Sequence, residues 1–206
     1  VARVQERELR EIDRALETNL AILALDASDH EALEALERLH AAKGDHRELL
    51  GIYRRKLERS REPRARSDIQ FKIGQLYEDV IGDDDQAVAT YAQVLEQDGD
   101  DLRALRDLDR SLERNQRGAE LAEILVRELA LVEPGPTSRE GPAWVELKYR
   151  LGRIREAEVG DVAGAIENYQ EILEVEPAHD RARAALERRL DDGQHRLAAA
   201  GILEPI

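Results

Sequence analysis

Histidines and acidic turns are the residues of this chain that could bind a metal or transfer protons. The five histidines are dispersed, and no two have the His-x-x-x-His spacing that places both ligands of a zinc site on one helical face. The acidic segments 82–85 and 98–101 lack the alternating ligands and the distant Glu of a calcium-binding EF-hand loop. We therefore predict no metal and no cofactor, and interpret these aspartates as helix caps.

A catalytic site would need a nucleophile, an acid or a base held together in a pocket, and the candidate residues are scattered along the chain. The sequence contains no cysteine, which excludes disulfides, thiolate metal sites and cysteine nucleophiles. Its glycines are isolated and form no phosphate-binding loop. We predict that the chain is not an enzyme.

The net charge of the chain indicates which classes of partner it disfavours. The 206 residues include 45 acidic and 31 basic side chains, for a formal net charge of −14. This charge repels a phosphate backbone at long range, so we predict no nucleic-acid partner. No apolar run approaches the length of a membrane span, so we predict no membrane insertion and expect a cytoplasmic location, with the periplasm as the open alternative.

The chain is periodic. A shift of 78 positions superposes Gly74 on Gly152 and Tyr91 on Tyr169, and a shift of 72 superposes the stretch from Asp29 on the stretch from Asp101. Apolar residues recur at three and four positions within each copy, as on an amphipathic helix. Each large period therefore corresponds to two helical hairpins of roughly 36 to 39 residues.

Turn residues divide this pattern into units. Gly82 and Gly160 can take the left-handed conformation that ends a helix, and the aspartate after each can cap the next helix. We predict a single repeat domain with units at residues 1–28 (partial), 29–62, 63–100, 101–133, 143–178 and 179–206 (partial), with a loop at 133–142. Because the chain begins at Val1 and has no methionine, we interpret it as a fragment of a longer protein.

These units resemble the tetratricopeptide repeat, which places Leu-Gly and Tyr on its first helix and Ala, an aromatic residue and a closing Pro around its second. The matching residues are Ile73-Gly74, Tyr77, Ala87 and Tyr91 in one copy, and Leu151-Gly152, Ala165, Tyr169 and Pro177 in a later copy. The resemblance implies an all-α, right-handed α-α superhelix of antiparallel helix pairs, similar to repeat arrays of large bacterial, particularly myxobacterial, proteins. It also implies that Leu36, Tyr91, Leu95, Tyr169 and Leu173 are core residues.

In this family the exposed positions of each first helix line a concave groove that holds peptides or partner helices. The position after the family glycine is arginine in four of five units. Neighbouring exposed positions add three more arginines, Arg103, Arg106 and Arg181, and two aromatic residues. The predicted partner-binding residues are Arg38, Phe71, Gln75, Arg106, Arg110, Tyr149, Arg153 and Arg188. Arginine binds carboxylates through two hydrogen bonds, so the predicted partner is a protein or peptide, in particular an acidic segment.

Two alternatives remain open at this point. The arginines could form ordinary intrahelical bridges, namely Arg110–Glu113, Arg153–Glu156 and Arg188–Asp191. The chain would then be a structural spacer, or a segment that regulates another domain of a larger protein. The resemblance also allows end-to-end stacking through exposed terminal repeats.

Overall fold

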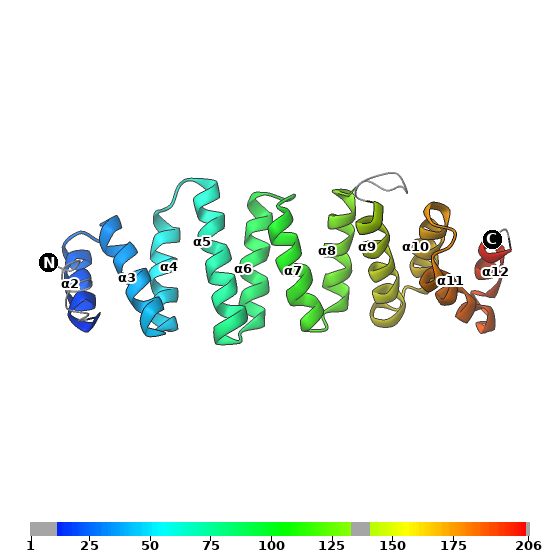
Figure 1. Ribbon diagram of the computed structural model, residues 1–206, viewed down its shortest axis with the longest axis horizontal. Helices are drawn as coiled ribbons and strands as arrows, with labels where there is room; N and C mark the ends of the chain where they lie inside the picture. The colour runs from blue at the N-terminus through cyan, green and yellow to red at the C-terminus, as the bar shows by residue number, and fades with distance from the viewer. Residues whose placement is uncertain (1–11, 133–140, 205–206) are drawn as a thin grey trace. The chain divides into compact units, whose positions relative to one another are not determined.

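The computed structural model describes residues 12–132 and 141–204, and these residues form helices with no β-strand among them (Figure 1). The chain divides into two compact units, Val1–Gly99 and Asp100–Ile206. The predicted all-α architecture is thus confirmed. Each unit is described separately below.

The first unit is a series of helices in which each packs against the next in the chain. Its elements are α2 (Ile12–Leu25), α3 (His30–Lys43), α4 (His46–Arg59), α5 (Pro63–Leu76), a π-helical turn η2 (Tyr77–Ile81) and α6 (Asp84–Gln97). The short turns between them give hairpins of antiparallel helices, as in a helical repeat.

The second unit continues the same pattern. Its elements are α7 (Leu102–Arg114), α8 (Gly118–Ala130), α9 (Gly141–Ile154), a π-helical turn η3 (Arg155–Val159), α10 (Val162–Val175), α11 (Asp180–Glu187), a 3₁₀ turn η4 (Arg188–Asp191) and α12 (Arg196–Leu203). The predicted loop lies mostly outside the described residues, since α9 already begins at Gly141.

The helix ends follow the turn chemistry of the sequence. Asp29 accepts a hydrogen bond from the backbone N–H of Ala32 at 2.8 Å and thereby caps α3, which ends at Gly44 with a φ of 75°. Pro63 occupies the first turn of α5, where its missing N–H leaves no hydrogen bond unmade. These caps fix where each hairpin turns.

Gly82 and Gly160 end two helices in the predicted left-handed conformation, with φ of 73° and 79°. Both follow a π-helical turn, in which the N–H of Gly82 donates to the carbonyl oxygen of Tyr77 at 2.8 Å. The sequence spacing here is one residue longer than the usual repeat, and the wider turn accommodates that residue without breaking the helix.

The core of each unit forms where two helices cross at a glycine. Tyr91 and Tyr169 are buried, and a Cβ atom added to Gly152 would lie 2.7 Å from Cε1 of Tyr169. Glycine therefore provides the space that the tyrosine ring occupies. The remaining predicted core residues, Leu36, Leu95 and Leu173, are also buried, which confirms the register of the helices.

Candidate partner-binding surfaces

Tyr149 on α9 is the centre of a cationic and aromatic surface in the second unit. Its ring lies 5.9 Å from the ring of Tyr169 and 5.7 Å from that of His179, measured between centroids. The guanidinium of Arg181 lies 4.4 Å from the centroid of the Tyr149 ring, within the range of a cation–π contact, and also pairs with Glu146. Three helices, α9, α10 and α11, thus hold the partly exposed Tyr149 in place.

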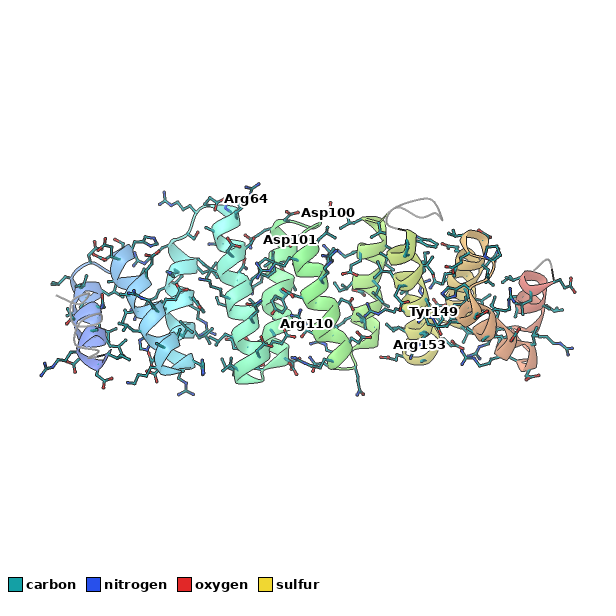
Figure 2. All side chains as sticks on the ribbon, viewed as in Figure 1. Arg64, Asp100, Asp101, Arg110, Tyr149 and Arg153 are labelled. Carbon is teal, nitrogen blue, oxygen red and sulfur yellow. The ribbon has the colours of Figure 1, made fainter. Side chains whose placement is uncertain are left out.

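Arg153 and Arg188 extend this surface. Arg153 is one helical turn beyond Tyr149 on α9, as Figure 2 shows, and both arginines are exposed. Burial and the neighbouring Tyr149 raise the pKa of the Tyr169 hydroxyl to about 12, while Arg188 and Arg153 act in the opposite direction. Both charges therefore lie near the same hydroxyl. We call Tyr149, Arg153, Arg181 and Arg188 the α9–α11 cationic surface.

The two α7 arginines lie in different surroundings. Arg110, labelled in Figure 2, pairs with Asp107 at 2.9 Å one turn earlier on the same helix. Arg106 is exposed, and its charge acts on the carboxyl of Glu128. Each of these two arginines therefore lies near a carboxylate of its own unit.

The carboxylates of two of the intrahelical bridges that remained open as an alternative have partners on other helices. Glu113 pairs with Arg150 at 3.0 Å. Glu156 accepts a hydrogen bond from the Tyr169 hydroxyl at 3.0 Å and pairs with Arg189. Within residues 12–132 and 141–204, Arg153 and Arg188 form no ion pair within 4.0 Å, and both charges remain available at the surface.

In the first unit, Arg38 lines an open cavity of about 710 Å³ on α3. Its walls carry both signs of charge, since Glu31, Glu34, Lys56 and Lys72 also line it. The charge of this cavity is therefore mixed, and the Arg-lined groove stays a prediction.

Phe71 and Gln75 on α5 have different exposures. Gln75 is exposed, as predicted for a residue that faces a partner. The prediction that Phe71 supplies exposed apolar surface is wrong, because Phe71 is only 3% exposed and its ring lies 6.3 Å from that of Tyr91. Burying the ring against Tyr91 removes more apolar surface from water than leaving it on the helix face.

Sequence reasoning missed a partly buried charge cluster in the first unit. Glu37 on α3 accepts hydrogen bonds from Lys56 on α4 and, at 2.6 Å, from Lys72 on α5. Burial pushes the pKa of Glu37 upward, but these hydrogen bonds outweigh that effect and the pKa is lowered. The cluster therefore ties three successive helices together through one carboxylate.

The second unit repeats this cluster with different charges. The two sequence shifts place Asp109 at the position of Glu37, Glu128 at that of Lys56 and Arg150 at that of Lys72. Arg150 donates to both carboxylate oxygens of Asp109, at 2.7 and 2.5 Å. Comparison of charged residues between repeats, rather than glycines and tyrosines alone, would have indicated these pairs.

Glu128 is the member of this cluster without a cation of its own. It is 5% exposed, and its Oε1 atom is buried without a hydrogen-bond partner among the described residues. Burial, together with the negative charge of Asp109, raises the pKa of Glu128 to about 7, against the opposing charges of Arg150 and Arg106. A carboxylate thus stands where the other unit has a lysine.

Two models described as tetratricopeptide repeat match residues 32–67 and 68–101. Residues 32–101 are therefore similar to two consecutive tetratricopeptide repeats. Proteins with such repeats are generally non-catalytic, and the repeats support a role as a protein-interaction scaffold.

Several solved tetratricopeptide repeat structures are similar to the chain. YrrB, described as a TPR protein with an unusual peptide-binding site, is 17% identical, with a TM-score of 0.48 and coverage of 90% of this chain and 88% of YrrB. MamA is 19% identical, with a TM-score of 0.48 and coverage of 82% and 91%. The C-terminal part of a TPR repeat-containing protein from Cytophaga hutchinsonii is 13% identical, with a TM-score of 0.49 and coverage of 100% and 80%. None of the curated proteins matches the chain.

In the part of the chain that the structure describes, every helix is too short or too polar to cross a bilayer.

Proposed function

We propose that the chain binds an acidic segment of a partner protein on the α9–α11 cationic surface. The observation that supports this most is that Arg153 and Arg188 are exposed and form no ion pair within the described residues, although the protein carries a net charge of −14. Both guanidinium groups are therefore available to a carboxylate from another chain.

The chemistry of the neighbouring residues fits such a segment. Arginine forms two parallel hydrogen bonds with a carboxylate, and Tyr149 offers a partly exposed ring for an apolar or aromatic side chain between the acidic ones. Because each exposed ion pair contributes only about 0.2–1 kcal/mol, affinity must come from several such contacts along an extended peptide.

Fluorescence anisotropy tests the proposal with a labelled peptide of alternating glutamate and glycine that carries one central phenylalanine. We expect Arg153→Glu and Arg188→Glu each to weaken binding several-fold, since each replaces an attraction with a repulsion. Arg196→Glu makes the same charge change on the exposed face of α12 and should leave affinity within twofold. Equal affinity for all four proteins, with unchanged helicity by circular dichroism, would contradict the proposal.

A second candidate function is that of a rigid spacer in a larger protein. It is favoured by the clusters around Glu37 and Asp109, which join successive helices inside each unit through buried ion pairs. If the chain is only a spacer, no arginine substitution on the α9–α11 cationic surface changes recovery of any partner.

A further inference from the structure

A strongly basic segment runs through the end of α4 and the start of α5 in the first unit. Residues 54–66 include seven arginines and lysines and only two glutamates, in a protein whose net charge is −14. Such a concentration of one sign is unfavourable for an isolated fold, because like charges repel. We therefore expect the basic residues of this segment to have a role either in the fold or in binding.

Three of these basic residues have structural roles. Lys56 pairs with Glu37, and Arg54 donates to the hydroxyl of Tyr77 at 2.6 Å. Arg66 donates to two backbone carbonyl oxygens near the end of α4, at 2.8 and 3.0 Å. These contacts fasten α4 to its neighbours and explain why these three are basic.

The other basic residues lack such a role. Arg55, Arg61 and Arg64 are exposed, as is Arg47 at the start of α4, and none forms an ion pair within residues 12–132. Arg59 acts only at longer range, as one of the charges that lower the pKa of the exposed Asp26. Figure 2 shows Arg64 at the N-terminal end of α5. No ion pair of the first unit accounts for these five arginines among its described residues.

Gly51 lies in the middle of α4, four residues from both Arg47 and Arg55 on the outward face. A Cβ atom added here would meet nothing within 4 Å, and its φ is not positive, so neither packing nor backbone conformation requires glycine. Glycine in a helix interior costs about 0.5–1 kcal/mol relative to alanine. The shift of 72 places the exposed Glu123 of α8 at this position, so the repeat itself does not require glycine either.

We propose that the outward face of α4, on which Arg47, Gly51, Arg55 and Arg59 lie beside the exposed Glu48 and Glu58, is a docking surface for an extended acidic polypeptide segment. The 14 residues of α4 form a face about 21 Å long, which matches about six residues of extended chain. Gly51 leaves the helix backbone bare between the arginines, so a partner backbone can approach closely. This surface is distinct from the α9–α11 cationic surface and does not depend on it.

The chemistry of this face favours carboxylates over a nucleic acid. Binding of single-stranded nucleic acid combines basic residues with aromatic rings on which bases stack. The only aromatic residue of α4 is Tyr53, which is 8% exposed and belongs to the core side of the helix. An acidic peptide needs only the guanidinium groups, which donate pairs of hydrogen bonds to its carboxylates.

Hydrogen exchange of the whole chain, read by mass spectrometry with and without poly-L-glutamate, locates the docking surface. We expect protection across α4 and the start of α5 that disappears at high salt. The triple variant Arg47→Glu/Arg55→Glu/Arg59→Glu should bind poly-L-glutamate about tenfold more weakly, because three attractions become repulsions. The matched triple Arg153→Glu/Arg188→Glu/Arg196→Glu carries the same change of charge in the second unit and should keep the protection of α4.

Gly51→Gln separates binding from folding. The variant should melt at the same or a higher temperature, since glutamine is the better helix former, and yet bind poly-L-glutamate more weakly because its side chain covers the backbone. Unchanged affinity of both Gly51→Gln and the α4 triple variant would overturn the proposal, as would protection confined to α9–α11. Tighter binding of a single-stranded RNA oligonucleotide of equal charge would overturn the assigned class of partner.

Discussion

At the residue scale, the position of Glu128 shows how one substitution between repeats changes the chemistry of a buried site. Its counterpart in the first unit is Lys56, which neutralises Glu37. In the second unit two carboxylates, Asp109 and Glu128, share Arg150 as their strongest cation, and only Asp109 has its hydrogen bonds. The carboxyl of Glu128 therefore binds its proton more tightly than a carboxyl exposed to water does.

This environment predicts an unusual dependence of stability on pH. The carboxyl of Glu128 titrates at 4.5 when unfolded and at about 7 when folded, so between these values the folded state binds the additional proton. The free energy of unfolding should therefore fall as the pH rises from 4.5 to 7, by up to about 3 kcal/mol.

Urea unfolding followed by the fluorescence of Trp144 measures this effect, because the single tryptophan lies in the same unit. Glu128→Gln should abolish the fall and make the protein more stable than wild type at pH 8, whereas Glu123→Gln on the exposed face of α8 should change neither. A wild-type curve that stays flat between pH 5 and 8 would contradict the assignment.

At the element scale, glycines with the same sequence appearance have opposite roles. Gly74 on α5 faces the ring of Tyr91, and a Cβ atom added there would lie 2.7 Å from the Cζ atom of that ring. Gly51 on α4 faces solvent, with no atom within 4 Å of its Cβ position. Only the first glycine determines how closely two helices approach.

Alanine substitutions in α4 and α5 distinguish these roles. Gly74→Ala should lower the free energy of unfolding of the first unit by about 1–3 kcal/mol, because the Tyr91 ring must move out of a packed core. Gly51→Ala should raise it by about 0.5–1 kcal/mol, since only helix propensity changes. Thermal unfolding by circular dichroism provides the comparison, and a stabilising Gly74→Ala would show that the two helices can separate freely.

At the scale of the whole molecule, the sequence predicts the helices better than it predicts their surfaces. The spacing of Gly44, Gly82 and Gly160 predicts the hairpins because each helix end is determined by a few adjacent residues. The exposure of Phe71 is set by Tyr91, a residue of another helix, and no local pattern reveals that the ring turns inward. Its counterpart Tyr149 stays partly exposed beneath an arginine.

The ion pairs, like the exposure of Phe71, depend on residues that are distant in the sequence. Arg150 contacts Asp109 across 41 positions of sequence. Glu113 and Glu156, each of which follows an arginine by three residues, also pair with arginines of other helices. Pairs between neighbouring helices shield the charges from water, which makes them stronger than exposed pairs along one helix. The repeat period predicts such contacts only when the charged residues themselves are compared.

Because the two clusters are equivalent in sequence but not in charge, equivalent substitutions should have unequal effects. Lys72→Met leaves Glu37 paired with Lys56 and should cost less than about 1 kcal/mol. Arg150→Met leaves Asp109 and Glu128 without their strongest cation, and should cost about 3 kcal/mol or more at pH 8.

Unfolding is read by circular dichroism for Lys72→Met and by Trp144 fluorescence for Arg150→Met. Lowering the pH to 5.5 should recover part of the loss only in Arg150→Met, since Glu128 then takes up a proton. Equal losses of unfolding free energy in Lys72→Met and Arg150→Met would contradict this prediction. The position in the repeat, rather than the surrounding charges, would then determine how much each ion pair stabilises the fold.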